Sequence, residues 1–291
     1  MSIVVLRSVN KWKLNQGNQP IPRLPQMSPP DKFEGVEALI FDVFGTSHLV
    51  NKLIVGTVVD WRKSVVDYLQ TLPQPSEPLD HARFAQEWRN GYHEAISRFA
   101  KAPDPNQFKT VDEIHLGILK RLVQEYNLAN IWNEELLEEI NSIWHRLHGW
   151  DDATAGLGLL KQKYIIGTLS NGNVRLLVDM AKFAKLPWDV VFSGDLLKAY
   201  KPNKRTYLGA CEYLQLPPEK VGMVRIMFGM LLKYKVAAHL GDLEAAKSFG
   251  LKTIYVKREG EDRDSTDSDS SYVDMFANSF IEVAHRLGIS R

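Results

Sequence analysis

The chain has 291 residues, 44% of them hydrophobic, which is enough for one large core or for a core with a smaller inserted domain. Its 36 basic and 35 acidic residues nearly cancel, so no overall field attracts nucleic acid or an anionic membrane, and we expect neither as a partner. No apolar run approaches the roughly 20 residues of a membrane span, which predicts a soluble protein. The single cysteine, Cys211, lies in a helical pattern and is interpreted as a packed residue.

Residues 1–33 are expected to be an extension outside the fold. The segment 1–30 contains the basic residues Arg7, Lys11, Lys13 and Arg23 and no acidic ones, a composition that resembles a weak organelle-targeting segment. Met27 also reads as a natural start, in which case the segment 1–26 is an extension of the gene model. We therefore expect a cytoplasmic protein, or a mitochondrial one if the segment is a genuine targeting signal.

The apolar run 36–40 predicts a buried strand, and Asp42 follows it directly. An acid at the carboxyl end of a buried parallel strand lies where open α/β sheets keep their active sites, although an isolated Asp there is as often the cap of the next helix. From residue 61 to residue 150 the apolar spacing becomes helical, which predicts four helices inserted after the first strand.

Beyond residue 150, strand and helix patterns alternate, which predicts right-handed crossovers and a parallel sheet. The expected strands cover 164–169, 190–192, 236–238 and 253–256, and the expected helices cover 174–185, 203–214 and 243–249. The last apolar set, from Val273 to Leu287, has helical spacing. The predicted fold class is α/β, with a Rossmann-like parallel core made of 34–60 and 151–291 and a helical cap domain over 61–150.

Polar residues follow several of the apolar runs in a fixed order. After Asp42 come Ser170 and Asn171, then Lys201, then Asp242. This order resembles the haloacid dehalogenase superfamily. The strings F-D-V-F-G-T, T-L-S-N-G-N, Y-K-P-N and V-A-A-H-L-G-D-L are similar to those of the type II L-2-haloacid dehalogenases.

The resemblance implies that Asp42 is a nucleophile that forms an ester, which water then cleaves. Lys201 would hold Asp42 ionised, because a nearby cation lowers the pKa of an aspartate. Asp242 would help to hold Lys201 and the hydrolytic water, and Arg89 would receive the halide. The substrate is expected to contact Phe44, Thr46, Ser170, Asn171, Tyr207 and His239.

Several of these residues have plain structural alternatives. In isolation, Lys201 before a proline is most often a solvated lysine, and Arg89 is most often a solvated arginine on a helix. A core tyrosine on a helix face is an equal alternative for Tyr207. His239 stands where characterised relatives often have Asn, which puts substrate range and rate in question.

The nature of residue 44 separates two reaction classes. Phosphatases of the superfamily place a second acid two residues after the nucleophile to protonate the leaving group, and this chain has Phe44 there. Halide leaves as a stable anion and needs no such proton. Ala237 also replaces one of two acids that would bind magnesium, so we expect no metal ion and no cofactor.

The predicted function is therefore hydrolytic dehalogenation of short L-2-haloacids to 2-hydroxy acids. A small-molecule phosphatase is the second hypothesis, and a catalytically silent relative that binds a carboxylate or a protein is the third. The expected partner is a small-molecule 2-haloacid, and a homodimer is possible.

Two insertions interrupt the family pattern, at 47–57 and at 224–235. Because Gly45 and Thr46 are echoed by Gly56 and Thr57, the sequence leaves open which pair lies beside Asp42. Translated intron or another gene-model error explains both insertions better than evolved loops. Extruding such a loop costs roughly 2 kcal/mol, less than burying Lys235 in the sheet, so we expect two loops: one beside the active site, the other near the opposite end of the fourth strand.

Overall fold

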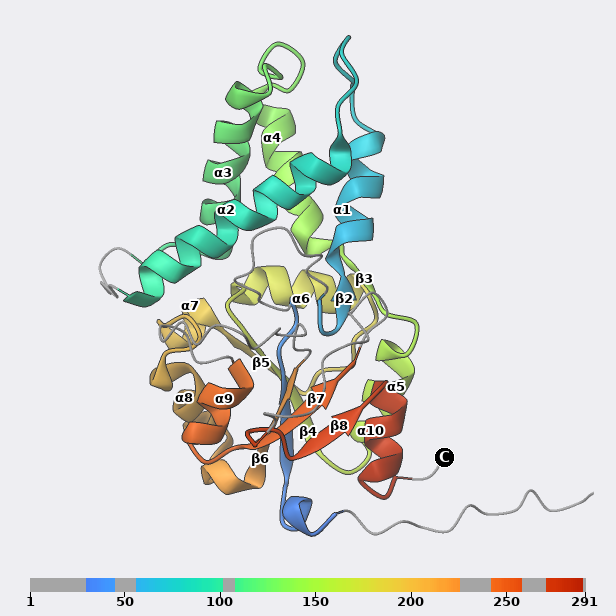
Figure 1. The fold of residues 1–291 in the computed structure, drawn as a ribbon, viewed down its shortest axis with the longest axis vertical. Helices are drawn as coiled ribbons and strands as arrows, with labels where there is room; N and C mark the ends of the chain where they lie inside the picture. The colour runs from blue at the N-terminus through green and yellow to red at the C-terminus, as the bar shows by residue number, and fades with distance from the viewer. Residues whose placement is uncertain (1–29, 45–55, 102–107, 226–241, 258–270, 290–291) are drawn as a thin grey trace, which may run out of the picture.

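The computed structural model describes residues 30–44, 56–101, 108–225, 242–257 and 271–289. Thr46, His239, the predicted strand 236–238 and most of both insertions lie outside these ranges. Two units are visible in Figure 1, a sheet flanked by helices and a group of helices above its upper edge. No helix within the described ranges is both long and apolar enough to cross a membrane.

The sheet has six strands in the order β5-β4-β1-β6-β7-β8, and every neighbouring pair is parallel. The strands are β1 (Ala38–Phe41), β4 (Ile165–Ser170), β5 (Val190–Ser193), β6 (Val221–Arg225), β7 (Lys252–Val256) and β8 (Met275–Ala277). Strand β1 is central, and its four residues are all buried. The predicted parallel α/β class is confirmed.

Side chains alternate between the two faces of the sheet, as the pleat of a strand requires. In β1, Ala38 and Ile40 join one apolar cluster, while Leu39 and Phe41 join the other. The first cluster is covered by α7 (Gly194–Leu197), α8 (Lys204–Leu214) and α9 (Asp242–Ser248), and the second by α5 (Ala153–Leu160), α6 (Val174–Phe183) and α10 (Phe280–Arg286). Both faces of the sheet are therefore buried, which explains its apolar strands.

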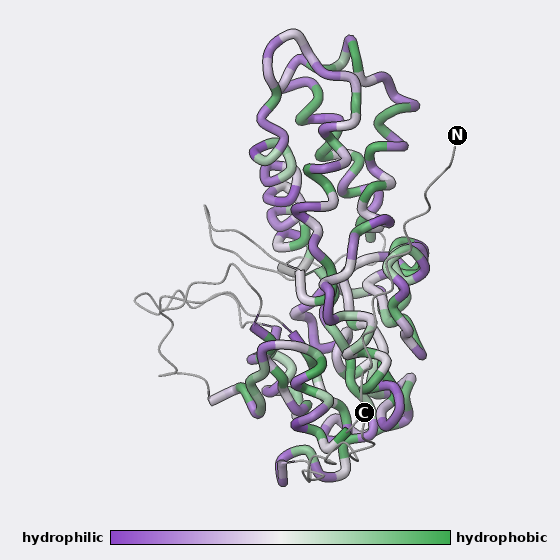
Figure 2. Tube along the Cα trace, turned by 90° about the vertical axis from the view of Figure 1, so that its right-hand side faces the viewer, coloured by the Kyte–Doolittle hydropathy of each residue, from purple (hydrophilic) through white to green (hydrophobic). Residues whose placement is uncertain are grey.

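The upper group of helices, which we call the helical unit, leaves and rejoins the sheet through two short paired strands, β2 (Val59–Asp60) and β3 (His148–Gly149). It consists of α1 (Trp61–Gln70), α2 (His81–Lys101), α3 (Val111–Glu125), α4 (Glu134–Asn141) and the 3₁₀ turn η3 (Ser142–His145). Helix α3 begins with a reciprocal capping box between Thr110 and Glu113. Along these helices polar and apolar residues alternate in short stretches (Figure 2), as expected of amphipathic helices.

The structure corrects two predicted boundaries. The sequence places 31–33 outside the fold, but these residues form the 3₁₀ turn η1 (Asp31–Phe33), and Phe33 is buried in the core. The spacing predicts helix throughout 273–287, whereas β8 precedes α10. In β8 the exposed Phe276 lies between the buried Met275 and Ala277, which is the alternation of a strand.

The second insertion also begins later than predicted. Val224 and Arg225 belong to β6, where Phe41 pairs with Val224. Because β6 is parallel to β1, the chain leaves it at the edge that carries Asp42, so the predicted exit at the opposite end of the strand is wrong. A further 3₁₀ turn, η4 (Pro218–Lys220), precedes β6. The division into a core and a cap domain at the predicted residues stays a prediction.

Candidate active site

Asp42 begins where β1 ends, and the sheet holds its main chain. Its N–H donates to the carbonyl of Val224 over 3.0 Å, which continues the β1–β6 ladder by one residue. The side chain is 3% exposed. Its Oδ1 accepts a hydrogen bond from Lys201 Nζ at 2.7 Å, and its Oδ2 accepts one from Thr57 Oγ1 at 3.1 Å. The two carboxylate oxygens are thus oriented by two different segments of the chain, those that carry Lys201 and Thr57.

Lys201 links Asp42 to a second carboxylate. Its ammonium group also donates to Asp242 Oδ2 over 2.6 Å, and the side chain is buried. The main-chain N–H of Lys201 donates to Asn171 Oδ1 at 2.8 Å, so the residue after β4 positions the lysine. The interpretation of Lys201 as a solvated lysine before a proline is therefore wrong.

Asp242 is the first residue of α9, and its Oδ1 accepts a hydrogen bond from the Tyr207 hydroxyl. Burial and the adjacent Asp242 carboxylate raise the pKa of Tyr207 well above its usual value. The tyrosine therefore stays a neutral donor at physiological pH. Its ring lies in the core, 5.4 Å from the ring of Phe249, while its hydroxyl contacts Asp242. Tyr207 is therefore both a core residue and a member of the charged cluster. The predicted contact between Tyr207 and substrate stays a prediction.

Arg225 completes the charged cluster, and sequence reasoning placed it inside an insertion. Its Nε lies 3.7 Å from Asp42 Oδ2, and its Nη1 lies 3.7 Å from Asp242 Oδ2. The side chain is only 4% exposed. Two cations and two carboxylates therefore meet at the carboxyl edge of β1 and β6.

The cluster keeps Asp42 ionised. Burial by itself raises the pKa of the carboxyl group, because a charge is poorly solvated in the interior. The charges of Lys201 and Arg225, with the hydrogen bonds from Lys201 and Thr57, outweigh burial and hold the pKa of Asp42 below its ordinary value. A buried, ionised and oriented carboxylate has the properties of a nucleophile.

Arg89 of α2 is surrounded by aromatic rings and lies close to Asp42. Its guanidinium carbon is 4.6 Å from the centroid of the Tyr92 ring, and the rings of Phe44, Trp61 and Trp144 are within 5.6 Å. The group donates to the carbonyl of Phe44 over 3.1 Å. Burial lowers its pKa, but a guanidinium remains charged in proteins. The alternative of a solvated helix arginine is thus excluded.

Ser170 and Asn171 lie at the end of β4, next to the start of α6, and both are buried. Ser170 Oγ accepts from the N–H of Gly172 at 3.2 Å, while the N–H of Val174, the first residue of α6, donates to Asp195. Asn171 is engaged with Lys201 as described. The first amide of α6 therefore already has a partner, the Asp195 carboxylate. The predicted contact of Ser170 and Asn171 with a substrate carboxylate stays a prediction.

Of the two Gly-Thr pairs, only Gly56 and Thr57 lie within the described residues. Thr57 donates to Asp42, and it is fully buried. The chain returns at Gly56, and the N–H of Val58 donates to the carbonyl of Val43 at 3.2 Å, so both flanks of the first insertion meet beside the nucleophile. A Cβ on Gly56 would lie 2.1 Å from the Val59 carbonyl oxygen, which explains the glycine. The predicted site residues Thr46 and His239 lie outside the described residues.

Sequence reasoning named Asp42, Lys201 and Asp242, which the structure brings together, but it missed Arg225 and left Thr57 undecided. Arg225 carried a signal similar to that of Asp42, a charged residue directly after an apolar run in the sequence. The aromatic surround of Arg89 carried a weaker signal, since Tyr92 is three residues further along the same helix face.

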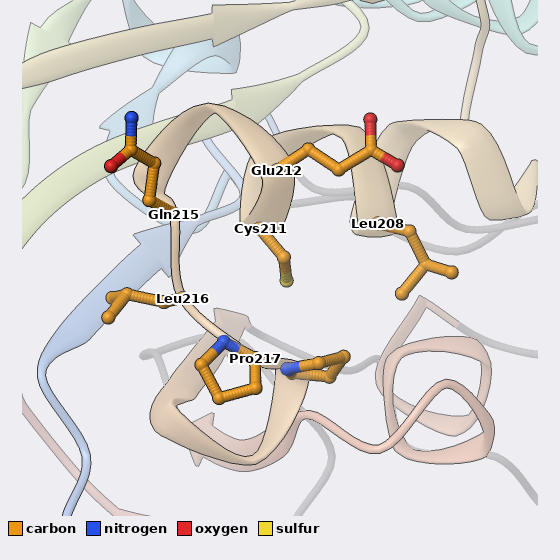
Figure 3. A pocket seen from close by; sticks show the side chains of 7 residues that line it. Leu208, Cys211, Glu212, Gln215, Leu216 and Pro217 are labelled. Atoms are coloured by element: carbon orange, nitrogen blue, oxygen red, sulfur yellow. The ribbon is translucent and has the colours of Figure 1, made fainter.

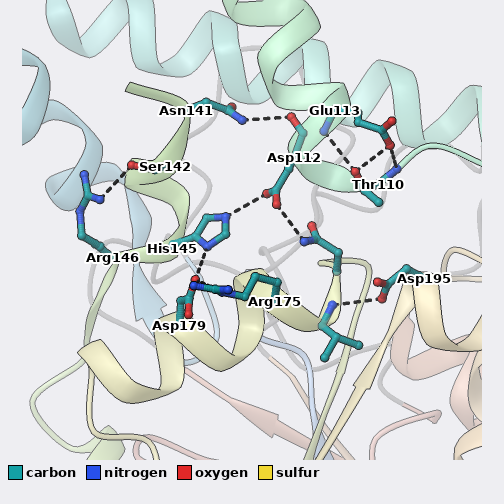
Figure 4. A network of polar contacts seen from close by, with 12 residues as sticks. Thr110, Asp112, Glu113, Asn141, Ser142, His145, Arg146, Arg175, Asp179 and Asp195 are labelled. Carbon is teal, nitrogen blue, oxygen red and sulfur yellow. Dashed lines mark hydrogen bonds and ion pairs between the residues drawn. The ribbon is translucent and has the colours of Figure 1, made fainter. Parts of the chain in front are cut away.

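Two further features lie outside this cluster. Figure 4 shows His145 of η3 between Asp112 of α3 and Asp179 of α6, at the junction of the helical unit with the sheet unit. Figure 3 shows an open groove beside Cys211, formed by α8 and the following prolines Pro217 and Pro218. Burial raises the pKa of Cys211 to about 11, so its thiol is protonated at neutral pH, in keeping with a packed residue.

The fold and the cluster together define an α/β protein with an ionised aspartate at the end of its central strand. A family model described as haloacid dehalogenase-like hydrolase matches residues 36–224. The chain therefore belongs to the haloacid dehalogenase-like hydrolase family, and the resemblance found in the sequence is confirmed.

Individual relatives narrow the comparison. The (S)-2-haloacid dehalogenase 4A of Burkholderia cepacia is 34% identical over 128 residues, which are 43% of this chain and 50% of that protein. The chain spans about half the length of the curated relatives it matches. The crystal structure of the L-2-haloacid dehalogenase PA0810 is 34% identical with a TM-score of 0.71, and the match covers 88% of this chain and 100% of that one. The defluorinating L-2-haloacid dehalogenase Rha0230 is 32% identical with a TM-score of 0.70, over 87% and 95% of the two chains.

Proposed function

We propose that this protein hydrolyses the carbon–halogen bond of short L-2-haloacids and releases halide and a 2-hydroxy acid. The observation that carries the proposal is the buried Asp42 carboxylate, hydrogen-bonded to Lys201 over 2.7 Å and to Thr57 over 3.1 Å. The names of the relatives, dehalogenases of (S)- or L-2-haloacids, support the same substrate class.

In the proposed first step, an oxygen of Asp42 attacks carbon 2 of the substrate from the side opposite the halogen. The new C–O bond forms as the C–halogen bond breaks, so the configuration at carbon 2 is inverted. Arg89 would receive the departing halide, because a desolvated guanidinium surrounded by aromatic rings is a favourable site for a poorly hydrated anion. Ser170 and Asn171 would bind the substrate carboxylate.

In the proposed second step, water attacks the carbonyl carbon of the Asp42 ester. The ester C–O bond at that carbon breaks, the hydroxy acid leaves, and Asp42 regains its carboxylate with one oxygen from water. Asp242 and Lys201 would orient this water, and the Tyr207 hydrogen bond would keep Asp242 in place. One proton is released for each halide.

The phosphatase hypothesis has less support from the described residues. Position 44, where a leaving-group acid would lie, carries a phenyl ring 5.5 Å from Arg89. Asp42 and Asp242 are each contacted by Lys201 and Arg225, and two cations between the carboxylates oppose the entry of a divalent metal. The silent-relative hypothesis assumed that the insertions displace Thr46 or Asp42. The Asp42 side chain is hydrogen-bonded on both oxygens, which argues against its displacement, whereas Thr46 lies outside the described residues.

The test is halide release from L-2-chloropropionate, D-2-chloropropionate and chloroacetate with EDTA and no added metal. We expect release from the L-isomer and from chloroacetate, unchanged by the chelator. Asp42→Asn removes the nucleophilic carboxylate and is expected to reduce release to background, while Asp67→Asn, an exposed acid of α1, leaves it unchanged. Release that requires magnesium, or hydrolysis of a phosphomonoester in its place, would contradict the proposal.

A homodimer and a cytoplasmic location also stay proposals. Light scattering at micromolar protein concentration measures the first, and a mass near 33.1 kDa would exclude the dimer. Imaging of the full chain tests the second, with mitochondrial import as the contrary result.

A further inference from the structure

Arg225 occupies a position that the strand pairing dictates. In the β1–β6 register Phe41 pairs with Val224, so the next residues, Asp42 and Arg225, are neighbours at the carboxyl edge of the sheet. The carbonyl of Val224 accepts the N–H of Asp42 over 3.0 Å, which fixes the two backbones against each other. Arg225 also pairs with Tyr255 of β7, so its own backbone belongs to the sheet.

Among the described residues, Lys201 and Arg225 are the two cations that each pair with both carboxylates of the cluster, while Arg89 acts on Asp42 from the helical unit. Asp42 and Asp242 are both buried, and both are hydrogen-bonded to the single ammonium group of Lys201. Without Arg225, the two carboxylates would share the single ammonium group of Lys201 as their paired cation, and such incomplete pairing is costly in a poorly solvated interior. Arg225 lies 3.7 Å from one oxygen of each carboxylate and supplies the second positive charge.

This balance matters for the reaction proposed above. A 2-haloacid carries its own carboxylate, and Asp42 must be ionised to attack it, so two anions have to come close together. A second cation beside Asp42 reduces their repulsion and opposes protonation of Asp42 as the substrate enters.

We propose that Arg225 is a positioning residue that neutralises the pair of Asp42 and Asp242, so that Asp42 remains an ionised nucleophile beside an anionic substrate. The inference rests on the proposed function for its role in the reaction, whereas the contact between Arg225 and the carboxylates rests on geometry alone. Its separation of 3.7 Å from each carboxylate is that of an ion pair and exceeds that of a hydrogen bond. Arg225 therefore contributes charge, while Lys201 and Thr57 orient the oxygens.

The test compares wild type, Arg225→Met and Arg225→Lys by the pH profile of kcat/KM for L-2-chloropropionate. With one of two cations removed, the pKa of Asp42 is expected to rise, so the acid limb of the Arg225→Met profile moves to higher pH and kcat/KM at pH 7 falls about 10- to 100-fold. Arg225→Lys keeps the charge and is expected to restore the acid limb. Among the residues that the structure describes, the other charged or titratable groups around Asp42 are Lys201, Asp242, Arg89, Tyr92 and Tyr207, and they are unchanged in all three proteins.

Arg205→Met is the matched control, because Arg205 is exposed on α8, the helix that carries Tyr207. It removes one positive charge without removing a contact to the cluster, and its profile is expected to equal that of wild type. An Arg225→Met protein with the wild-type acid limb and wild-type kcat/KM overturns the proposal. So does an Arg225→Lys protein whose profile equals that of Arg225→Met while both remain folded by circular dichroism.

A second measurement needs no catalysis and separates the two proposals. It is a double-mutant cycle of Arg225→Met and Asp42→Asn, measured by urea unfolding. The arginine substitution is expected to raise the unfolding constant at least about tenfold more when Asp42 is intact than when it carries the Asp42→Asn change. If the two substitutions are coupled in unfolding but wild type releases no halide, the result contradicts the dehalogenase function and supports the charge balance. Equal effects in both backgrounds overturn the charge balance, whatever the activity.

Discussion

The two oxygens of Asp42 are held in different ways, and this difference defines the site at the scale of single residues. Lys201 supplies a full charge to Oδ1, whereas Thr57 supplies a neutral hydroxyl to Oδ2. Thr57 lies at the end of the first insertion and Lys201 lies much further along the chain, so two segments that are far apart in sequence orient the nucleophile. The hydroxyl is one of the groups that lower the pKa of Asp42.

Thr57→Val removes that hydrogen bond at nearly constant shape. A hydrogen bond to a charged group is worth about 1.5–3 kcal/mol, so kcat/KM for L-2-chloropropionate is expected to fall roughly 10- to 100-fold. The pKa of Asp42 rises without the hydroxyl, and the acid limb of the profile moves to higher pH. Thr57→Ser retains the hydroxyl and serves as the control. Equal losses in the valine and serine proteins would indicate packing as the role of Thr57.

At the scale of elements, a polar cluster around His145 lies at the junction between the helical unit and the sheet unit. His145 of η3 contacts Asp179 of α6 through Nδ1 at 3.0 Å and Asp112 of α3 through Nε2 at 3.2 Å. Asn173, which precedes α6, donates to the other oxygen of Asp112 over 2.8 Å. Arg175 also pairs with Asp179, so two cations share that carboxylate when the histidine is protonated (Figure 4).

Partial burial lowers the pKa of His145, but the two aspartates outweigh it and raise the pKa above its ordinary value of 6.5. The stabilisation from its proton is therefore complete below pH 6.5 and is lost as the pH rises through the folded-state value. His115, a buried histidine of α3, is kept neutral because burial lowers its pKa well below the usual value. The junction is thus expected to weaken on the alkaline side of neutrality.

His145→Gln tests this expectation. The variant is expected to be less stable than wild type by on the order of 1 kcal/mol near pH 5.5, because two partly buried ion pairs are lost. The difference should diminish above the folded-state pKa of His145, as measured by urea unfolding between pH 5.5 and 9. His81→Gln is the control, since His81 lies at the start of α2 and bonds only to Gln74 among the described residues. A stability difference that grows with pH would have the wrong sign for this account.

At the scale of the whole molecule, one apolar cluster runs through both units. It contains Phe41 of β1 and Phe280 of α10 together with Val65 of α1, Trp88 of α2 and Leu122 of α3. A continuous core couples the two units, and a chain of this kind is expected to unfold in one transition. The tryptophans of the helical unit, Trp61, Trp88, Trp132 and Trp144, are fully buried and report on that unit.

Phe280→Ala places a cavity in the sheet unit, where the ring packs edge-on against Phe41 at 5.4 Å. We expect a loss of about 3–5 kcal/mol in the free energy of unfolding. Tryptophan fluorescence and far-UV circular dichroism should lose their signals at the same, lower urea concentration. Phe276→Ala, on the exposed face of β8, is the matched control with a much smaller loss. Two separate transitions would show that the units unfold independently.

Much of this structure was predictable, because its signals are local. Apolar runs indicate the strands around Asp42 and Ser170, and helical spacing indicates α6 and α8 close to their observed bounds. The strand β8 was missed because Val273, Phe276 and Phe280 fit a helical period, although the buried Met275 and Ala277 reveal alternation. Local periodicity is ambiguous in such short runs.

The candidate site was predictable only in part. Asp42, Lys201 and Asp242 were found because their order along the chain is a motif, whereas Arg225 was assigned to an insertion and Thr57 remained one of two alternatives. The sequence around Arg225 and Thr57 does not indicate which residue each of them contacts. Their contacts arise from the register of β1 with β6 and from the return of the chain at Gly56.

By itself, the sequence determined the parallel α/β fold, the helical insertion and the identity of the acid at the end of the central strand, because periodicity, burial and turn chemistry act over a few residues. Only the tertiary structure showed that Thr57 donates to Asp42 and that Arg225 lies beside it. It alone showed that Arg89 lies among aromatic rings. These are properties of side chains brought together from segments that are far apart along the chain, and such contacts depend on strand register and packing.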